Sequence, residues 1–259
     1  MMEPLVSVIT AAYNSEKTVA ETIESVLGQT YGSIEYIIAD GASSDRTVEI
    51  AESYRPEFER RGYRYTIISS RDSGIYAGIN KGIAMAHGIL AGCVNADDYY
   101  EPGMVQAAAE CYLERKYDLF YADVRIVSGS GVRVGVKRAR RMKGMITTRH
   151  WNHPTMFVPR RVYRRQKYDE SYRYYADFDY MLRLYKRGGR ITVVNRPLSN
   201  FRLGGASTRG GVKESIRRAG ERYRVYRNSG YSRLYLAECL FMDVGKGVAG
   251  KIMEQAGYE

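Results

Sequence analysis

The first hundred residues alternate short apolar runs with stretches in which apolar residues recur at steps of three and four. The apolar runs are rich in β-branched side chains and predict strands over residues 5–9, 34–39, 65–69 and 89–94. The stretches between them predict helices over residues 16–27, 46–59 and 74–86. A strand followed by a helix, three times in succession, predicts a doubly wound α/β unit around a parallel sheet.

The remaining pattern is less regular but still alternates. It predicts helices from Pro102 to about residue 114 and over 178–187, and strands over 119–127, 132–136 and 190–195. Residues 212–228 predict an amphipathic basic helix whose apolar positions are Val212, Ile216, Ala219, Tyr223 and Tyr226. This stripe either packs on the core or leaves the helix to attach to anionic lipid.

Three polar or aromatic side chains follow predicted strands, namely Tyr13, Asp40 and Asp97. Because ligands of open parallel sheets bind beyond the carboxyl ends of the strands, we expect these side chains to line one crevice. A nicotinamide-binding unit would need G-x-G-x-x-G after the first strand, and residues 10–15 contain no glycine. The chain also lacks the glycine and Ser/Thr pattern of a P-loop.

The fourth apolar run ends in Asn95-Ala96-Asp97-Asp98, which puts two adjacent carboxylates at a strand end. Such a position suits a divalent metal that holds a diphosphate, since Mg²⁺ takes one or two protein carboxylates and fills its octahedron with water and phosphate oxygens. The alternative is a loop whose acids cap the following helix. These four residues alone leave both interpretations open.

Composition narrows the class of protein. With 44% hydrophobic and 27% charged residues among 259, the chain is typical of a soluble globular protein and excludes long disorder. Cys93, Cys111 and Cys239 are too few and too scattered for a disulfide framework or a zinc cluster, which fits a reducing cytosol. No signal-peptide pattern and no long apolar stretch is present. We therefore expect a cytoplasmic protein, soluble or peripheral at the inner face of the membrane.

The net charge of +11 is unevenly distributed. Residues 1–123 hold 10 Lys and Arg against 19 acids, residues 124–168 hold 13 against none, and residues 169–259 hold 17 against 10. Cationic surfaces gather phosphates, so the second half suits nucleic acid or an anionic membrane. The run Lys137-Arg138-Ala139-Arg140-Arg141 is either a solvated loop or a grip on an anionic acceptor or membrane surface.

Three spaced motifs can now be put together: Val6-Ser7-Val8-Ile9 with Tyr13-Asn14, the run Ile37-Ile38-Ala39-Asp40-Gly41-Ala42-Ser43-Ser44-Asp45-Arg46-Thr47, and Asn95-Ala96-Asp97-Asp98. As an ordered set they strongly resemble the family 2 glycosyltransferases of GT-A fold. A further run, Asp72-Ser73-Gly74-Ile75-Tyr76 followed by Ile79-Asn80-Lys81-Gly82, is similar to the bacterial polysaccharide-assembly subgroup that includes colanic-acid-type enzymes. The resemblance extends from residue 6 to about residue 207.

The resemblance implies a nucleotide site at the strand ends. By similarity, Ala11 and Tyr13 contact the nucleotide, and Asp40 accepts a hydrogen bond from the base, since a carboxylate suits an N–H donor. Arg71 and Lys81 are expected near the nucleotide or its phosphates.

The resemblance also implies a divalent cofactor, Mg²⁺ or Mn²⁺. The family metal motif is D-x-D, and this chain departs from it because Asn95 fills the first position. Asp97 is therefore the expected metal ligand, with Asp98 as the second choice.

An inverting transfer needs a base that deprotonates the acceptor hydroxyl. The segment Ala176-Asp177-Phe178-Asp179-Tyr180-Met181-Leu182-Arg183 resembles the family segment E-D-x-D-x-x-L-R, and Asp177 aligns with the base. Asp179 would point to another side of the helix, as a structural or acceptor-binding acid. Without the resemblance, both carboxylates are ordinary acids at the N-terminal end of a helix.

Two further segments match the family near the acceptor. His153 stands in a matching motif at residues 152–157, although a lone His before Pro is more often a structural donor. Residues 201–207 resemble the loop that folds over the donor, with a glycine pair that provides hinge freedom. Arg202 or Arg209 would then reach the diphosphate, because the arginine fork pairs two phosphate oxygens.

Together these observations predict an α/β protein of GT-A fold, with a doubly wound, mostly parallel sheet, a smaller acceptor-side region and a helical C-terminal tail. Residues 1–207 are expected to form the glycosyltransferase domain, with a nucleotide-binding half (1–100) and an acceptor-side half (101–207), and residues 208–259 a basic helical extension. The expected activity is that of an inverting, metal-dependent enzyme of hexosyltransferase type in bacterial polysaccharide or glycoconjugate assembly. Its expected partners are a nucleotide diphosphate sugar and a glycan or lipid-linked glycan acceptor. The basic segments suit a peripheral membrane contact and the tyrosine-rich tail a homo-oligomer.

Three alternatives belong to other classes. A sugar-nucleotide pyrophosphorylase would need a glycine-rich basic loop after the first strand, which is missing. A nucleic-acid-binding protein would explain the basic second half, yet no motif matches a nucleic-acid module and the acidic first half is a poor phosphate surface, so we expect no nucleic acid as a partner. A non-catalytic relative that only binds nucleotide sugars would fit the two departures from the family pattern, Asn95 and Ala176.

Overall fold

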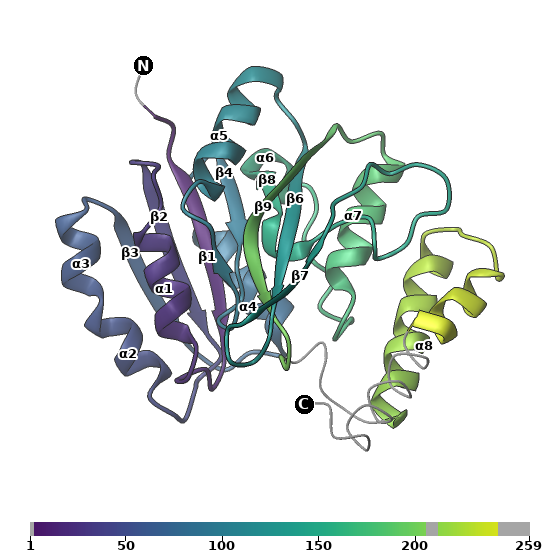
Figure 1. Cartoon of the computed structure of the whole chain (residues 1–259), viewed down its shortest axis with the longest axis horizontal. Helices are drawn as coiled ribbons and strands as arrows, with labels where there is room; N and C mark the ends of the chain where they lie inside the picture. Colours follow the sequence, from purple (N-terminus) through teal and green to yellow (C-terminus); the bar gives the residue numbers. More distant parts are fainter. Residues whose placement is uncertain (1–2, 206–211, 243–259) are drawn as a thin grey trace.

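A computed structural model describes residues 3–205 and 212–242 of the chain. Figure 1 shows one twisted sheet through the middle of the molecule with helices on both of its faces. The strands are β1 (Val6–Ala12), β2 (Ile34–Asp40), β3 (Arg64–Ser69), β4 (Leu90–Cys93), β5 (Tyr99–Tyr100), β6 (Leu119–Val127), β7 (Arg133–Lys137), β8 (Phe157–Pro159) and β9 (Ile191–Arg202). The helices are α1 (Val19–Leu27), α2 (Thr47–Ser53), α3 (Arg55–Arg60), α4 (Ile75–Met85), α5 (Met104–Arg115), α6 (Arg160–Tyr163), α7 (Ala176–Lys186) and α8 (Val212–Asn228), with a 3₁₀ turn η1 (His153–Thr155).

The strand order is β3-β2-β1-β4-β8-β6-β9-β5, and β7 pairs with β6 outside this path. β3, β2, β1 and β4 run parallel, and every residue of β1 and β2 is buried, as expected for strands covered by helices on both faces. β8 is antiparallel to both β4 and β6, whereas β9 is parallel to β6. The predicted α/β fold is confirmed, with a parallel first half and a mixed second half.

The two halves of the sheet meet where β4 pairs with β8. Gly92 lies opposite Phe157 in this register, and a Cβ atom at Gly92 would lie 2.3 Å from Cζ of that ring. Only a residue without a side chain lets the ring cross the strand here, and Phe157 is fully buried. Gly92 therefore permits the close contact between β4 and β8 that joins the parallel half of the sheet to the mixed half.

Several predicted elements differ in extent. The helix predicted over residues 46–59 is two helices, α2 and α3, which meet at Tyr54, and Pro56 lies in the first turn of the second. The strand predicted over residues 190–195 continues to Arg202 as β9, with irregular register opposite Asp123. The short elements β5, β8, α6 and η1 were not predicted, because two to four residues are too few to show a period.

The helix α8 packs on the core through part of the predicted stripe, namely Ala219 and Tyr226. Ile216 is 55% exposed, whereas Arg218 and Arg222 are buried, at 8% and 3% exposed. The buried face is made of Ser215, Arg218, Ala219, Arg222, Val225 and Tyr226. The predicted apolar stripe is therefore wrong at Ile216, because arginines stacked on tyrosines take part of the buried face. Among the residues that the structure describes, no helix is long and apolar enough to cross a membrane.

Candidate active site

The loops after β1 and β2 are fastened to each other by short polar side chains. Asn14 has a positive φ of 47°, and its side-chain oxygen accepts a hydrogen bond of 2.9 Å from the amide of Ser44. In return, the amide of Asn14 donates to Oγ of Ser43, at 2.9 Å. The amide of Ser15 donates to Oγ1 of Thr47, at 2.7 Å. These bonds hold the loops at two neighbouring strand ends together, where the sequence predicts the crevice.

The floor of this crevice is made of small residues. A Cβ atom at Gly41 would lie 3.2 Å from a carboxylate oxygen of Asp72 and 3.3 Å from the Tyr13 ring, and one at Gly78 would lie 3.4 Å from the Cβ of Ala11. The ring of Tyr13 is 65% exposed. An exposed ring beside a floor of small side chains suits a flat ligand such as a nucleotide base.

Asp72 was not among the predicted site residues, although it begins the Asp72-Ser73-Gly74 run that carried part of the resemblance. One of its carboxylate oxygens accepts a hydrogen bond from the amide of Gly74, at 3.1 Å, just before α4 begins. This run was the sequence signal that could have identified Asp72 as a site residue. Its carboxylate lies beside Gly41 and Gly78, which makes it part of the crevice.

Asp40 lies at the end of β2, as predicted, but its carboxylate already has partners. It is buried and accepts hydrogen bonds from the amide of Ser43 at 3.0 Å, from Oγ of Ser69 at 2.6 Å and from Oγ of Ser43. Oδ2 accepts two of these bonds and Oδ1 accepts one, so a base would have to share this carboxylate with the serines. Its role as a base contact stays a prediction.

Arg71 lies before α4, and Lys81 lies within it. Lys81 donates from Nζ to both the carbonyl and Oγ of Ser70, at 3.0 and 2.8 Å, and so supports the turn that follows β3. Arg71 is exposed in that turn, next to Asp72. Both predicted cations therefore lie at the edge of the sheet where β1 and β2 end.

The two acids after β4 have different surroundings. Asp98 is buried, and its Oδ1 accepts a hydrogen bond of 3.0 Å from the amide of Arg202, while its carbonyl accepts one of 2.7 Å from Oγ1 of Thr22. Burial, reinforced by the charge of Asp97, raises the pKa of Asp98 well above its usual range. Asp97 is only half buried. Asp98 thus anchors the loop, and Asp97 is the carboxylate that a ligand can approach.

The residues around Asp97 fit a divalent cation. Oδ1 of Asn95 is buried without a hydrogen-bond partner in the described part of the chain, while its Nδ2 points to Asp98 Oδ2 at 3.4 Å. An uncommitted amide oxygen near a half-buried carboxylate is a hard donor set of the kind that Mg²⁺ and Mn²⁺ take. Three or more acidic, His or Cys side chains gather nowhere among the described residues, so a bound ion would also need oxygens from its ligand.

Arg202, predicted to reach a diphosphate, is engaged within the protein. Its Nε donates to the carbonyl of Asp97 at 3.2 Å, one terminal nitrogen donates to the carbonyl of Gly129 at 3.0 Å, and the other forms an ion pair with Glu21. The Arg202 side chain thereby joins the end of β9 to the loop that follows β4 and to α1. Its contact with a diphosphate stays a prediction, and Arg209 lies outside the described residues.

Asp177 is the second residue of α7. Its Oδ1 accepts a hydrogen bond of 2.7 Å from the amide of Phe178, and its carboxylate contacts the hydroxyl of Tyr76. Desolvation raises the pKa of Asp177 to about 7, although these hydrogen bonds and the charge of Lys137 oppose the rise. A carboxyl group with a pKa near neutrality is suited to take up a proton as a general base.

The other two predicted acceptor-side residues are held by the protein. Asp179 is buried and forms an ion pair of 2.6 Å with Arg183, one turn along α7, which favours the structural interpretation. Burial lowers the pKa of His153 to about 4, so its ring is neutral at physiological pH. Its Nε2 lies 3.4 Å from the hydroxyl of Tyr168.

Two residues near Asp177 were missed by the sequence. Tyr76 comes from α4, and its hydroxyl also donates to the carbonyl of Tyr174 at 2.8 Å. Lys137 comes from the end of β7, where its Nζ donates to the carbonyl of Trp151 at 2.8 Å. Because Tyr76 is in the first turn of α4, four residues after Asp72, its contact places Asp177 near the end of α4 that follows Asp72. Only packing reveals these contacts.

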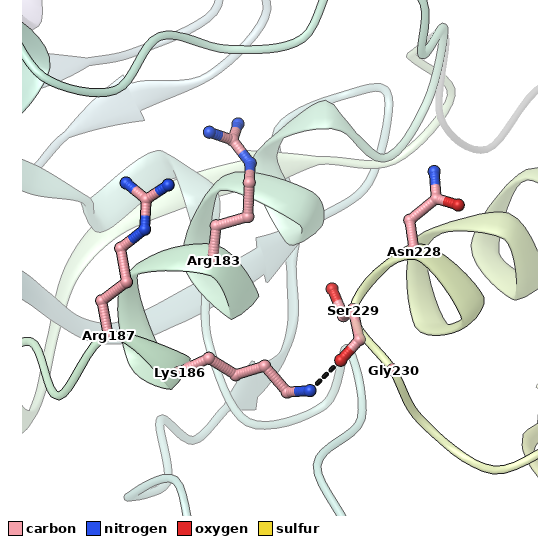
Figure 2. A pocket seen from close by; sticks show the side chains of 6 residues that line it. All are labelled: Arg183, Lys186, Arg187, Asn228, Ser229 and Gly230. Atoms are coloured by element: carbon pink, nitrogen blue, oxygen red, sulfur yellow. Dashed lines mark hydrogen bonds between the residues drawn. The ribbon is translucent and has the colours of Figure 1, made fainter.

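A cavity of about 410 Å³ lies at the C-terminal end of α7, and none of the proposed site residues lines it. Figure 2 shows its lining, in which Lys186 reaches across to the carbonyl of Ser229 at the end of α8. Its walls are Arg183, Lys186, Arg187, Asn228, Ser229 and Gly230. The cavity marks the seam between α7 and α8.

Comparison with known proteins places these features in a wider context. The model of the family described as Glycosyl transferase family 2 matches residues 7–172. The uncharacterized glycosyltransferase EpsJ of Bacillus subtilis is 29% identical over 216 residues, which are 78% of this chain and 62% of that protein. The PGL/p-HBAD biosynthesis glycosyltransferase Rv2957 of Mycobacterium tuberculosis is 28% identical over 195 residues, 74% of each chain.

Solved structures share the fold at low sequence identity. S. aureus TarS 1-349 in complex with UDP-GlcNAc has a TM-score of 0.66 at 18% identity, and the match covers 93% of this chain and 72% of that one. The mannosyltransferase PcManGT from Pyrobaculum calidifontis, in complex with GDP-Man and Mn²⁺, has a TM-score of 0.67 at 15% identity and covers 99% and 76%. These similarities confirm the predicted GT-A type of fold.

Proposed function

Because the chain belongs to glycosyl transferase family 2, we propose that it transfers a sugar from a nucleotide diphosphate sugar to an acceptor hydroxyl with inversion at the anomeric carbon. The observation that carries the proposal is Asp177, a carboxyl group with a pKa of about 7 that contacts Tyr76 near the start of α4. An inverting transfer needs a base of this kind to remove the proton of the attacking hydroxyl.

On the donor side, the Tyr13 ring would stack on the base above the floor of Gly41 and Gly78. Asp97, with the free amide oxygen of Asn95, would hold Mg²⁺ or Mn²⁺. A divalent ion at this position supplies charge that stabilises the leaving diphosphate. The printed ligands of the structural relatives, UDP-GlcNAc in TarS and GDP-Man with Mn²⁺ in PcManGT, support a nucleotide-sugar donor and a metal.

On the acceptor side, Asp177 would take the proton as the acceptor oxygen attacks the anomeric carbon. The charge of Lys137 would help keep the carboxylate ionised before the transfer. The attack would come from the face opposite the diphosphate, which gives inversion. Asp179 and His153 would support the acceptor wall, since both are held by neighbouring side chains.

The acceptor would be a glycan or a lipid-linked glycan of bacterial polysaccharide or glycoconjugate assembly. The name of the Mycobacterium tuberculosis relative, a PGL/p-HBAD biosynthesis glycosyltransferase, supports a biosynthetic role, and the resemblance of residues 72–82 supports the polysaccharide subgroup. We place the enzyme in the cytoplasm, at the inner face of the membrane where a lipid-linked acceptor is presented.

The direct test measures sugar transfer and donor hydrolysis by purified protein with UDP- and GDP-sugars, with and without Mn²⁺. We expect Asp97→Ala to lose activity together with the Mn²⁺-dependent part of nucleoside diphosphate binding, measured by calorimetry. Asp177→Asn should lose about 10²–10⁴-fold in kcat, the usual contribution of a general base, and keep that binding.

The matched control is Asp179→Asn, two residues along the same helix. Because Asp179 pairs with Arg183, its loss is expected to lower stability while kcat stays within about tenfold of the wild type. Wild-type activity in both Asp97→Ala and Asp177→Asn would overturn the site. Metal-dependent nucleotide binding without any transfer or hydrolysis would instead identify a non-catalytic relative.

A further inference from the structure

Side chains of α8 bind four of the five residues that precede the α7 helix, and Glu221 of α8 binds the amide of the fifth. Figure 1 shows α8 standing beside α7 at the edge of the molecule, outside the sheet. The side-chain contacts join Arg224 to Ser171 and Tyr172, Asn228 to Tyr172, Glu214 to Tyr174, and Arg222 to Tyr175. Residues 171–175 are thus fixed by a helix that follows them by about 40 positions in the sequence.

Glu221, in the middle of α8, makes the most concentrated of these contacts. Its carboxylate accepts hydrogen bonds from three consecutive backbone amides, those of Arg173 at 2.9 Å, Tyr174 at 2.6 Å and Tyr175 at 2.7 Å. These amides lie directly before the first residue of α7, where no preceding helical turn offers carbonyl acceptors. A carboxylate is the strongest acceptor for such donors and also complements the positive end of the helix dipole.

The fixed segment leads straight to Asp177. Tyr175 is the N-cap of α7, and Asp177 follows two residues later. Tyr76 binds the same stretch from the other side, because its hydroxyl donates to the carbonyl of Tyr174 and contacts Asp177. Glu221 and Tyr76 therefore both bind one short segment that ends two residues before Asp177.

We propose that Glu221 is a positioning residue for the base, and that α8 is part of the catalytic apparatus rather than an appended tail. The proposal rests on the proposed function, since it needs Asp177 to act as the base. Glu221 is remote from the donor crevice and acts through the backbone of residues 173–175. General-base catalysis depends on the reacting atoms being held within hydrogen-bonding distance, so small displacements of Asp177 are costly.

Other contacts keep α8 in place when Glu221 is changed. The rings of Phe178 in α7 and Tyr226 in α8 pack edge to face with centroids 5.2 Å apart, and Lys186 donates to the carbonyl of Ser229. The hydroxyl of Tyr226 also donates to the carbonyl of Ile146, at 3.1 Å. Loss of the Glu221 carboxylate should therefore release residues 173–175 locally without detaching the helix.

The experiment compares Glu221→Ala with the wild type in steady-state transfer. We expect kcat to fall at least about tenfold while the KM for the nucleotide sugar stays within about twofold, because the donor crevice is untouched. Hydrogen exchange should speed up at the amides of residues 173–175 and remain unchanged in β1 and β2.

The pH dependence of kcat distinguishes a role of Glu221 in positioning Asp177 from a role in the stability of the fold alone. The groups facing Asp177 are the hydroxyls of Tyr76 and Tyr168, the ammonium of Lys137 and the amide of Phe178. When the segment loosens, water reaches the carboxyl group and lowers its pKa toward the ordinary value. The acid limb of kcat should therefore move to lower pH in Glu221→Ala, which a purely structural role would not cause.

Two matched variants complete the design. Glu221→Gln keeps an acceptor oxygen and should retain kcat within about threefold, and Ile216→Ala, on the exposed face of the same helix, should behave as wild type. If Glu221→Ala does not fold, Glu221→Asp keeps the charge but is one methylene too short, and should show the same loss of kcat with a smaller amplitude. Unchanged kcat and pH profile in a folded Ala or Asp variant would overturn the proposal. An active Asp177→Asn would instead remove the proposed function on which it rests.

Discussion

The two sides of the crevice are built in different ways. The proposed donor side consists of the loops that follow β1, β2 and β4, and short polar side chains bond the first two of these loops to each other. The proposed acceptor side is assembled from α4, β7, α7 and α8, which contribute Tyr76, Lys137, Asp177 and Glu221 from distant parts of the chain. Nucleotide binding should therefore survive damage to the outer helices, while transfer should not.

The largest effect is expected from Tyr226→Ala. The Tyr226 side chain is fully buried against Phe178, and its removal leaves a large cavity between α7 and α8, at a cost of about 3–5 kcal/mol in the free energy of unfolding. We expect nucleoside diphosphate binding to persist, with kcat lost. Chemical denaturation would measure the loss of stability, and calorimetry would measure nucleoside diphosphate binding. If folded Tyr226→Ala lost binding together with kcat, the two sides of the site would not be independent.

The next effect is the pH dependence of transfer. The pKa of Asp177, the proposed base, is raised to about 7. Because a base acts when it is ionised, we expect kcat to be full above that pH and to fall as the pH drops below it. A fall of about 100-fold from the high-pH plateau to pH 5 corresponds to about 2.7 kcal/mol. Donor binding, measured by calorimetry over the same range, should not follow this limb. A limb near pH 4, the range of an ordinary aspartate, would show that desolvation of Asp177 does not govern the reaction.

A smaller effect is expected at the junction of the two sides. Gly92→Ala would push a methyl group into Phe157 and should cost about 1–3 kcal/mol, the usual range for overpacking. The control is Gly135→Ala in β7, where a Cβ meets nothing within 4 Å. Thermal melts of both variants would test this, and since β4 and β8 join the halves, Gly92→Ala should weaken binding and transfer together. Equal melting temperatures for the two variants would contradict it.

The smallest effect is confined to the donor loops. Asn14→Ala loses the bond to the Ser44 amide and places an alanine at φ 47°, which should cost about 1–2 kcal/mol and weaken nucleoside diphosphate binding. Asn14→Gly, which tolerates the backbone conformation, should recover part of the loss. Titration calorimetry would measure the binding. If Asn14→Ala also shifted the acid limb of the kcat profile, the proposed donor and acceptor sides would not act independently.

The same difference decides what the sequence could predict. Strands β1 to β4 and the crevice at their ends follow from apolar runs and the polar residues directly after them, because both are local properties of the chain. Tyr76 and Lys137 could not be placed beside Asp177, since that contact depends on how α4 and β7 pack. The predicted stripe on α8 failed at Ile216 because the periodic rule assigns burial to apolar residues, whereas Arg222 is buried against Tyr175.

The roles of the site residues also differ in whether local sequence or tertiary packing determines them. Asp97 and Asp98 were predicted as a pair, and only the fold separates the anchoring role of Asp98, which receives the Arg202 amide, from the approachable Asp97. Glu221 carried no motif at all, because a carboxylate that accepts backbone amides needs no particular neighbours in sequence. Roles that depend on tertiary packing therefore remained beyond sequence analysis.

The approach of Gly205 to Asp97 has a consequence for natural variation. A Cβ at position 205 would lie 2.2 Å from a carboxylate oxygen of Asp97, so any other residue there would displace the acid or the backbone around it. Among relatives that keep an acid at position 97, we expect glycine at position 205 to vary as little as the acid itself, although it offers no chemistry. An alignment would then show an invariant glycine at position 205, because the side chain at position 97 needs the space that a Cβ would fill.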